Sequence, residues 1–492
     1  MDETLLAPFA RRRRRKVGNL LVQSPQPWSH TIKDTSSESD TSDEDDESSL
    51  DDEDDWEEDD EEDGKEDHDE KEDTVPRAND QSPHPVDGDQ PILDDGFIVV
   101  KEDSTSAIAA WNRNFSGRPQ LELAREDALP FTVGQRLGGG GVGVVFETHI
   151  DGIPMALKRT YTRRMTSQQL NEIKILVRMS KNCHRHVVEL IGSYVHEQRG
   201  GFEIGMLIWP VARTDLAALL HDFDVLRQHY LDHLETNDTE PPQLSEEVEK
   251  IRAAMEPLLV LIPSGILRSD LLLRREIEQV LFLCGHRIRR SLGCIANAVA
   301  YLHEQSIRHK DLKPSQILLS PQGLWLADFG WSADMSEHDT STTSGDEMMT
   351  TKYQAPERAN RERCGRSEDI FSLGCIFLEM GYCTIPLARD TPRPWSQRGW
   401  SFQANLDRIQ DWMKPLNKIF WKEKIPEGVN PRNVTNTTSF PQLLMPMLAH
   451  VSNDRPSIQD VLHALSVASF VAHGNIMFLS DCCRPCVHGG SV

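Results

Sequence analysis

A glycine cluster between two strand-like segments constrains the fold of this chain more than any other feature of its sequence. The run LGGGGVGVV contains Gly138, Gly140 and Gly143 in the spacing G-x-G-x-x-G-x-V. Strand-like segments at 131–137 and 144–148 flank it, so the glycines are predicted to connect two strands rather than to open a helix. Because glycine has no side chain, its backbone N–H groups can approach phosphate oxygens closely. The cluster therefore predicts a phosphate-binding hairpin.

A lysine and a glutamate follow this hairpin at positions where they can pair. Lys158 lies in a third strand-like run at 155–159, joined to the preceding strand by turn residues at 151–152. Glu172 lies in an amphipathic helical pattern that is predicted to begin at 166–167. A cation on a strand and a carboxylate on the helix packed over it can form an ion pair. The pair would orient the ammonium group toward the α- and β-phosphates of a nucleotide.

Three short motifs farther along the chain carry a family resemblance. They read IRHKDLKPSQILL at 307–319, DFG at 328–330 and APE at 355–357. Together with the glycine cluster and the lysine–glutamate pair, they make the chain from about 131 to 470 resemble the eukaryotic protein kinases. The Lys-Pro pair after the aspartate is similar to that of serine/threonine kinases rather than tyrosine kinases.

The resemblance implies an α+β, bilobal protein-kinase-like fold, with a small β-rich N-lobe and a larger helical C-lobe. It also implies ATP and Mg²⁺ as cofactors and protein substrates as partners. In the family, the residue matching Asp311 accepts the proton of the substrate hydroxyl, the one matching Lys313 contacts the γ-phosphate, and the one matching Asp328 holds magnesium. The residues implied to enclose adenine are Val145, Ala156 and Leu318.

The resemblance also implies two structural contacts and a hinge. Asp369 is expected to brace the backbone of the catalytic loop, and residues 209–211 are expected to form the hinge between the lobes. Arg455 is expected to pair with Glu357 in a buried ion pair, in which the loss of one partner would leave the other charge unpaired.

Three departures from the family pattern bear on activity and organisation. Gln316 stands where the family has asparagine as a metal ligand beside Asp328, and one extra methylene displaces the amide oxygen by about 1.5 Å in a site that demands near-octahedral geometry. Lys310 replaces an arginine and offers a point charge instead of a bidentate fork. The segment at about 222–285 is longer than the usual connection, which predicts an added helical or partly disordered subdomain.

The resemblance thus favours an ATP-dependent protein kinase that transfers the γ-phosphoryl group to serine or threonine hydroxyls. A second reading is a pseudokinase or scaffold that binds nucleotide with weak or no transfer, because Gln316 alters the metal site. A third reading is a binder of basic proteins that acts through an acidic tail.

The N-terminal region differs in composition from the rest of the chain. The formal net charge is −26, and residues 38–73 hold −23 of it. Because residues 1–125 are rich in Ser, Asp, Glu and Pro and cannot bury enough apolar surface to offset the entropy of ordering, they are predicted to be disordered. The acidic run could bind basic proteins. The basic run at 11–16, RRRRRK, suits a nuclear import receptor or forms a solvated patch, and no direct binding to nucleic acid is expected.

Cysteine usage and the lack of long apolar stretches predict the compartment. The nine cysteines are mostly scattered and show no disulfide framework, which favours a reducing environment. The sequence contains no signal-peptide core and no run of about 18 apolar residues. These features predict a soluble intracellular protein without a membrane partner, either nuclear or cytoplasmic.

The predicted C-terminal tail, 471–492, carries the one cysteine group of the chain. Cys482, Cys483 and Cys486 form a C-C-x-x-C pattern, with His488 nearby. Such a group is compatible with a zinc site. Because the tail is predicted to lack supporting structure, the sequence favours free thiols.

Overall fold

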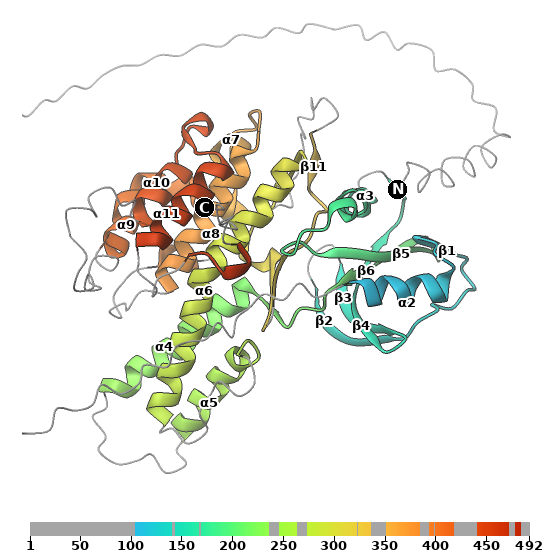
Figure 1. The fold of residues 1–492 in the computed structure, drawn as a ribbon, viewed down its shortest axis with the longest axis horizontal. Coiled ribbons are helices and arrows are strands. Elements are labelled where there is room, and N and C mark those ends of the chain that lie inside the picture. The colour runs from blue at the N-terminus through green and yellow to red at the C-terminus, as the bar shows by residue number, and fades with distance from the viewer. Residues whose placement is uncertain are drawn as a thin grey trace, which may run out of the picture. The chain divides into compact units, whose positions relative to one another are not determined.

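The computed structural model describes residues 104–483, apart from 140–142, 167–168, 236–245, 263–272, 322, 336–350, 384–392, 398, 418–439 and 472–477. Gly140, Cys486, the acidic run 38–73 and the basic run 11–16 lie outside the described residues. The described part has a β-sheet lobe and a helical lobe (Figure 1), which confirms the predicted α+β kinase-like fold class.

The β-sheet lobe is built on a six-stranded sheet in the order β1-β5-β6-β4-β3-β2. Its strands are β1 Gln120–Leu123, β2 Val133–Gly139, β3 Val144–Ile150, β4 Ile153–Thr162, β5 Glu189–Gln198 and β6 Gly201–Trp209. β1 runs parallel to β5, whereas the other neighbouring strands are antiparallel. The predicted strands at 131–137, 144–148 and 155–159 overlap β2, β3 and β4.

The turn between β3 and β4 forms where the sequence predicted it. Asp151 and Gly152 both have a positive φ, at 52° and 77°. Two consecutive residues with positive φ are the requirement of the two-residue hairpin turn that matches strand twist. This turn sets the register that places Val145 opposite Lys158.

One helix of the sheet lobe was missed by the sequence analysis. Residues up to 125 were predicted to be disordered, yet α2 (Thr105–Phe115) and β1 are ordered in the structure. Ala107, Ala110 and Trp111 are buried in α2 at helical spacing and pack into the core of the sheet lobe. The prediction was wrong for residues 104–123, because two alanines and one tryptophan bury enough surface only when the sheet is there to receive them.

The tryptophan of α2 covers one face of the sheet at very close range. A Cβ atom on Gly192 of β5 would lie 2.2 Å from the Trp111 ring, so a side chain is excluded there. Along β4, Met155 and Leu157 are fully buried in this cluster. Since side chains alternate along a strand, the intervening Ala156 and the next residue, Lys158, point to the opposite face. α2 therefore closes the back of the sheet that carries the lysine.

Replacing Trp111 with phenylalanine tests this packing. The variant loses ring volume and the hydrogen bond that the Trp111 Nε1–H donates to the Arg118 carbonyl oxygen at 2.7 Å. We expect the free energy of unfolding to fall by about 1–2 kcal/mol in urea titrations. Ile108→Ala, on the exposed side of α2, is the matched control and should change it by less than about 0.5 kcal/mol. Equal stabilities of the two variants would contradict the packing of α2.

The helical lobe follows β6. Its helices are α4 Leu216–Glu235, α5 Glu246–Leu259, α6 Leu273–Glu304, α7 Pro356–Ala359, α8 Ser367–Cys383, α9 Ile409–Asn417, α10 Phe440–Met447 and α11 Ile458–Val471. Its short strands are β7 Thr214–Asp215, β8 Ile307–Arg308, β9 Ile317–Ser320, β10 Gly323–Leu326 and β11 Ala333–Asp334. α6 and α8 contact each other at the centre of this lobe, where most of their side chains are buried.

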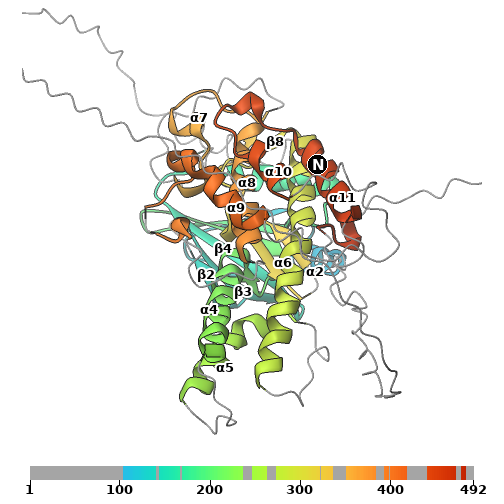
Figure 2. The same cartoon turned by 90° about the vertical axis from the view of Figure 1, so that its left-hand side faces the viewer.

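The described part of the predicted insert at 222–285 is helical. α5 lies within it and contacts both α4 and α6 (Figures 1 and 2). Its buried face consists of Ile251, Met255 and Leu258, which follow one another at helical spacing. The two helices that α5 contacts are also linked to each other, because the Tyr230 hydroxyl of α4 donates to Glu278 of α6 at 2.5 Å.

A short segment after α11 also packs onto the helical lobe. Phe478 and Leu479 are buried, and the backbone N–H of Gly293 in α6 donates to the Phe478 carbonyl oxygen at 2.8 Å. The expectation of an unsupported tail at 471–492 is therefore wrong for residues 478–483. Two apolar residues, Phe478 and Leu479, provide the anchor.

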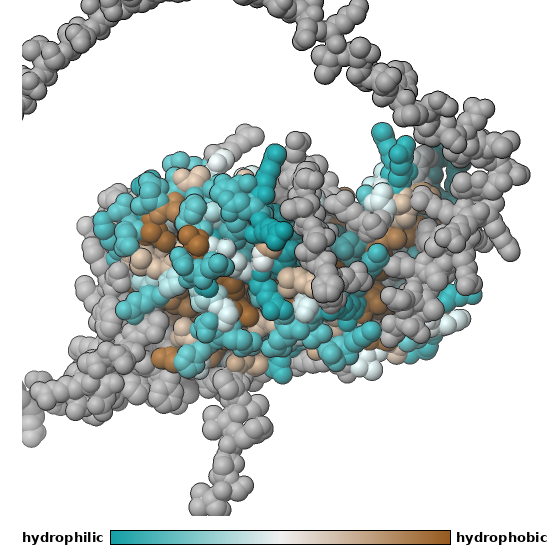
Figure 3. All heavy atoms as spheres, turned by 90° about the horizontal axis from the view of Figure 1, so that it is seen from above, coloured by the Kyte–Doolittle hydropathy of each residue, from teal (hydrophilic) through white to brown (hydrophobic). Residues whose placement is uncertain are grey.

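The surface and the helices give two further observations. On the face drawn in Figure 3, hydrophilic side chains predominate among the coloured residues, and apolar ones form small separate patches. None of the helices in the described ranges combines the length and apolar content needed to cross a membrane.

Candidate active site

Three charged side chains meet between β4, α3 (Asn171–Met179) and the DFG segment. Lys158 Nζ lies 2.7 Å from Glu172 Oε2 and 2.8 Å from Glu172 Oε1. The same nitrogen lies 2.7 Å from Asp328 Oδ1. The predicted lysine–glutamate pair is therefore present, and it extends to the aspartate.

The helix that carries Glu172 begins later than predicted. Its first residue is Asn171 rather than 166–167. Ahead of it, the Thr166 backbone N–H donates to Gln169 Oε1 at 2.9 Å, so this side-chain contact forms before the helix starts. The apolar face of α3 then buries Ile173 and Leu176, which keeps Glu172 turned toward Lys158.

Burial and charge act against each other in this cluster. Burial works to lower the pKa of Lys158, but the charges of Glu172 and Asp328 outweigh it and raise the pKa to about 12. Burial raises the pKa of Glu172, and the charge of Lys158 opposes that rise. The lysine is therefore a permanent cation at neutral pH.

Asp328 is held from both sides by protein donors. Besides Lys158, the amide Nε2–H of Gln316 donates to Asp328 Oδ2 at 2.7 Å. Burial works to raise the pKa of Asp328, but the charge and hydrogen bond of Lys158 and the hydrogen bond of Gln316 bring it below its usual value. Asp328 has a positive φ of 65°, a backbone conformation that non-glycine residues seldom adopt.

These groups fit a divalent cation in part. An ionised carboxylate such as that of Asp328 is the ligand that Mg²⁺ prefers. Gln316 presents its amide nitrogen, not its oxygen, to Asp328 in this structure. The carboxylate therefore suits the metal as it stands, whereas Gln316 would have to turn its amide over to become a ligand.

The predicted catalytic loop, residues 309–313, is anchored by one buried aspartate of α8. The backbone N–H groups of His309 and Lys310 donate to the two carboxylate oxygens of Asp369, both at 2.9 Å. His303 of α6 contacts the same carboxylate at 3.0 Å. The predicted bracing role of Asp369 is confirmed. Lys310 has a positive φ of 70°, so the two bonds fix a turn that the chain seldom adopts unaided.

This turn presents Asp311 next to a lysine. Asp311 is buried, and Lys313 Nζ lies 2.6 Å from its Oδ2. His309 links the loop to the DFG segment, because its Nε2 lies 3.0 Å from the Ala327 carbonyl oxygen. Asp311 and Asp328 are thus supported by connected backbone segments.

The residues expected around the adenine lie on three strands, Val145 on β3, Ala156 on β4 and Leu318 on β9 of the helical lobe. Gly138 pairs with Val145 across the β2–β3 hairpin, and Ala156 lies opposite Ile208 of β6. The side chains of Val145, Ala156 and Leu318 are all half-buried. Residues 209–211 begin with the last residue of β6 and lead to β7, which pairs with β9 in the helical lobe. Their position suits the expected hinge.

A family model for the protein kinase domain matches residues 265–465 of the chain. Over 153 residues the chain is 37% identical to mitogen-activated protein kinase kinase kinase 4 of Mus musculus, and over 313 residues it is 26% identical to cyclin-dependent kinase 20 of Homo sapiens. Over 158 residues it is 31% identical to the mitogen-activated protein kinase kinase mkk2 of Aspergillus fumigatus. The chain belongs to the eukaryotic protein kinase family.

The coverage of these relatives is uneven. The matches take in 30%, 59% and 30% of this kinase for the mouse, human and fungal proteins respectively. They span 8%, 69% and 30% of those relatives. The chain thus covers less than a third of the fungal and mouse proteins.

The ion pair that the glutamate of the APE motif was predicted to make is present in the kinase fold. Arg455 places its two terminal nitrogens 2.7 and 2.8 Å from the two oxygens of Glu357. The Arg455 side chain is fully buried and the Glu357 side chain is 5% exposed. This prediction is confirmed.

One contact of the kinase site was missed by the sequence analysis. The Asn171 side-chain amide donates to the carbonyl oxygens of Gly330 at 3.3 Å and Ser332 at 2.8 Å. Asn171 directly precedes Glu172. The first turn of α3 therefore contacts Lys158 through Glu172 and the segment after Asp328 through Asn171. The only sequence signal was an asparagine near a helix start, which is common at helix ends without such a role.

Proposed function

We propose that this kinase transfers the γ-phosphoryl group of ATP to serine or threonine hydroxyls of protein substrates. The observation that carries the proposal is the cluster of Lys158, Glu172 and Asp328, formed by groups from both lobes. A second pair, Asp311 and Lys313, lies on the catalytic loop braced by the same helical lobe. Phosphoryl transfer depends mainly on positioning and charge stabilisation, and these groups supply both.

Each residue of the proposed site has a separate task. Lys158, held by Glu172, would bind the α- and β-phosphates. Among the residues that the structure describes, none has an atom within 4 Å of where a Cβ of Gly138 would be. Packing against these residues does not require a glycine, and close approach of a phosphate gives a reason for it. Asp328 would hold Mg²⁺, which when bound neutralises phosphate charge. Asp311 would accept the proton of the substrate hydroxyl, and Lys313 would bind the γ-phosphate.

The class of acceptor can be tested directly. The purified full-length chain is incubated with γ-labelled ATP, Mg²⁺ and a mixture of basic proteins, and the labelled products are hydrolysed to phosphoamino acids. We expect the label on serine and threonine. Label on tyrosine alone would contradict the proposed specificity while leaving phosphotransfer intact.

The pseudokinase alternative depends on Gln316, and the substitution Gln316→Asn tests it. Gln316→Asn restores the shorter amide and removes a group that donates to Asp328. We expect initial rates of transfer in Mg²⁺ equal to or up to about tenfold above wild type, which is about 1.4 kcal/mol in the activation free energy. A large loss of rate would show that the site is adapted to glutamine.

The two charged runs of the N-terminal region stay predictions. Binding of basic proteins by 38–73 and nuclear import through 11–16 concern residues outside those that the structure describes. The local net charge of −23 supports the first of these proposals, because such a run attracts basic surfaces.

A further inference from the structure

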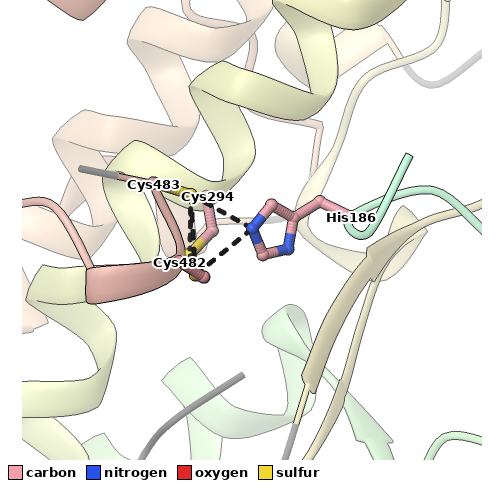
Figure 4. A group of neighbouring side chains, drawn as sticks. All are labelled: His186, Cys294, Cys482 and Cys483. Carbon is pink, nitrogen blue, oxygen red and sulfur yellow. Dashed lines mark hydrogen bonds between the residues drawn. The ribbon is translucent and has the colours of Figure 1, made fainter. Parts of the chain in front are cut away.

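Four potential metal ligands from distant parts of the chain meet at one point of the kinase (Figure 4). His186 lies between α3 and β5, Cys294 lies on α6, and Cys482 and Cys483 lie in the segment after α11. Their ligand atoms all lie within 4.8 Å of one another. None of the four takes part in the phosphotransfer proposed above.

The sulfur atoms form a nearly equilateral triangle. Cys294 and Cys482 lie 3.8 Å apart, Cys482 and Cys483 lie 3.6 Å apart, and Cys483 and Cys294 lie 3.7 Å apart. A disulfide would bring two sulfurs to about 2.05 Å, so none of these pairs is bonded. Zinc bonds of about 2.3 Å to sulfur place the sulfurs of a tetrahedral site about 3.8 Å apart.

The histidine supplies the fourth corner. Its Nε2 lies 3.1 Å from Cys483 Sγ and 3.5 Å from Cys482 Sγ, and in Figure 4 the ring points at the sulfur group. With a zinc–nitrogen bond of about 2.0–2.1 Å, a tetrahedral site requires nitrogen–sulfur distances of about 3.5 Å. Five of the six distances between the four atoms thus lie within about 0.4 Å of those of a tetrahedral zinc site, and the sixth, from His186 Nε2 to Cys294 Sγ, is at most 4.8 Å.

A contact behind the histidine ring prepares it as a ligand. His186 Nδ1 lies 3.0 Å from the Leu324 carbonyl oxygen of β10, and a carbonyl oxygen can only accept. The proton therefore sits on Nδ1, and the lone pair of Nε2 faces the sulfurs. Zinc-bound histidines usually have such a partner on their second nitrogen, which fixes both tautomer and ring orientation.

A buried cation lies on the same helix as Cys294. The side chain of Arg287, two turns earlier on α6, is buried. Three thiolates and one neutral imidazole around Zn²⁺ leave one net negative charge. A buried cation near Cys294 compensates that charge.

The backbone brings the C-terminal segment close enough to α6 for this geometry. At Gly293, the residue before Cys294, a Cβ would lie 2.3 Å from Leu479 and 2.8 Å from the Phe478 carbonyl oxygen. Only a glycine permits this approach. The buried Phe478 and Leu479 therefore hold this segment against α6, and Cys482 and Cys483 follow them closely in the sequence.

We propose that His186, Cys294, Cys482 and Cys483 bind one Zn²⁺ in a closed tetrahedral site. Binding replaces three thiol protons, which pass to solvent, and changes no oxidation state. With four protein ligands no position is left for water or substrate, so the zinc is structural. It would link three segments of the chain. These are the loop that follows α3, the helix α6, and the C-terminal segment.

The zinc content of the purified full-length protein tests the proposal. We expect about one zinc per chain by elemental mass spectrometry, and a loss of nearly all of it in the double variant Cys482→Ser/Cys483→Ser. The matched control is Cys183→Ser/Cys364→Ser, at two cysteines outside the cluster, and it should keep its zinc. Both variants replace two cysteines, so a difference in zinc content between them would be due to where the replaced cysteines lie.

A second measurement uses the wild-type chain and does not depend on how the variants fold. Removing the metal and titrating with Co²⁺ should give one equivalent of binding with sulfur-to-cobalt charge-transfer bands and the intense visible bands of a tetrahedral site. Zinc-free wild-type protein that binds no cobalt in this manner would overturn the proposal. So would unchanged zinc in the Cys482/Cys483 variant, or a disulfide among the three cysteines in protein purified under reducing conditions.

Discussion

Replacing Asp311 with asparagine is expected to slow phosphoryl transfer by roughly 10²–10⁴-fold, the usual contribution of a general base. Asparagine keeps the size of the side chain and an oxygen that can accept the hydrogen bond from Lys313, but it cannot take up the hydroxyl proton. The loss should appear in initial rates measured with γ-labelled ATP, with little change in ATP affinity or melting temperature.

The control for this variant is an aspartate of the same lobe that has no proposed role. Asp411 forms an exposed pair with Lys414 on α9, and Asp411→Asn should leave the rate unchanged. If Asp311→Asn kept a rate within a few-fold of wild type, Asp311 would not be the catalytic base.

Replacing Arg455 with alanine is expected to lower the free energy of unfolding by about 3–5 kcal/mol, because a buried carboxylate then loses its partner. Arg455 also donates to the carbonyl oxygens of Ser367, Ala449 and His450, so these acceptors lose a donor as well. Urea unfolding followed by tryptophan fluorescence would measure the change.

An exposed arginine gives the matched control for that experiment. Arg113 of α2 pairs with Asp151 at 2.8 Å, and its side chain is 63% exposed. Since exposed pairs contribute about 0–1 kcal/mol, Arg113→Ala should have a small effect. Similar losses in the two variants would contradict the structural role assigned to the Arg455–Glu357 pair.

Most of the proposed phosphotransfer site could be predicted from the sequence because its signals are local. The residues around Asp311 and Asp328 are contiguous motifs, and the Lys158–Glu172 pair follows from one strand and one helix in a fixed order. The contact of Gln316 with Asp328 was not predictable in detail. The sequence showed that the amide was one methylene longer, but not which of its two ends would face the carboxylate.

The parts that were missed depend on contacts between distant segments. The apolar signal of α2 is short, and it becomes significant only when Trp111 meets Gly192 and the sheet behind it. The cysteine group was interpreted by nearness in sequence, through Cys482, Cys483 and the neighbouring residues. The structure instead adds Cys294 and His186, which lie 188 and 296 residues from Cys482, and no spacing pattern encodes such a set.

The most direct test of the account is a comparison of ATP binding with phosphoryl transfer on the same purified full-length protein. Binding is measured by titration calorimetry, and transfer to itself and to a basic protein is measured with γ-labelled ATP, once with Mg²⁺ and once with Mn²⁺. The account predicts transfer with at least one of the two metals, and its loss in Lys158→Met. Tight ATP binding without transfer under either metal would contradict it and identify the chain as a nucleotide-binding scaffold.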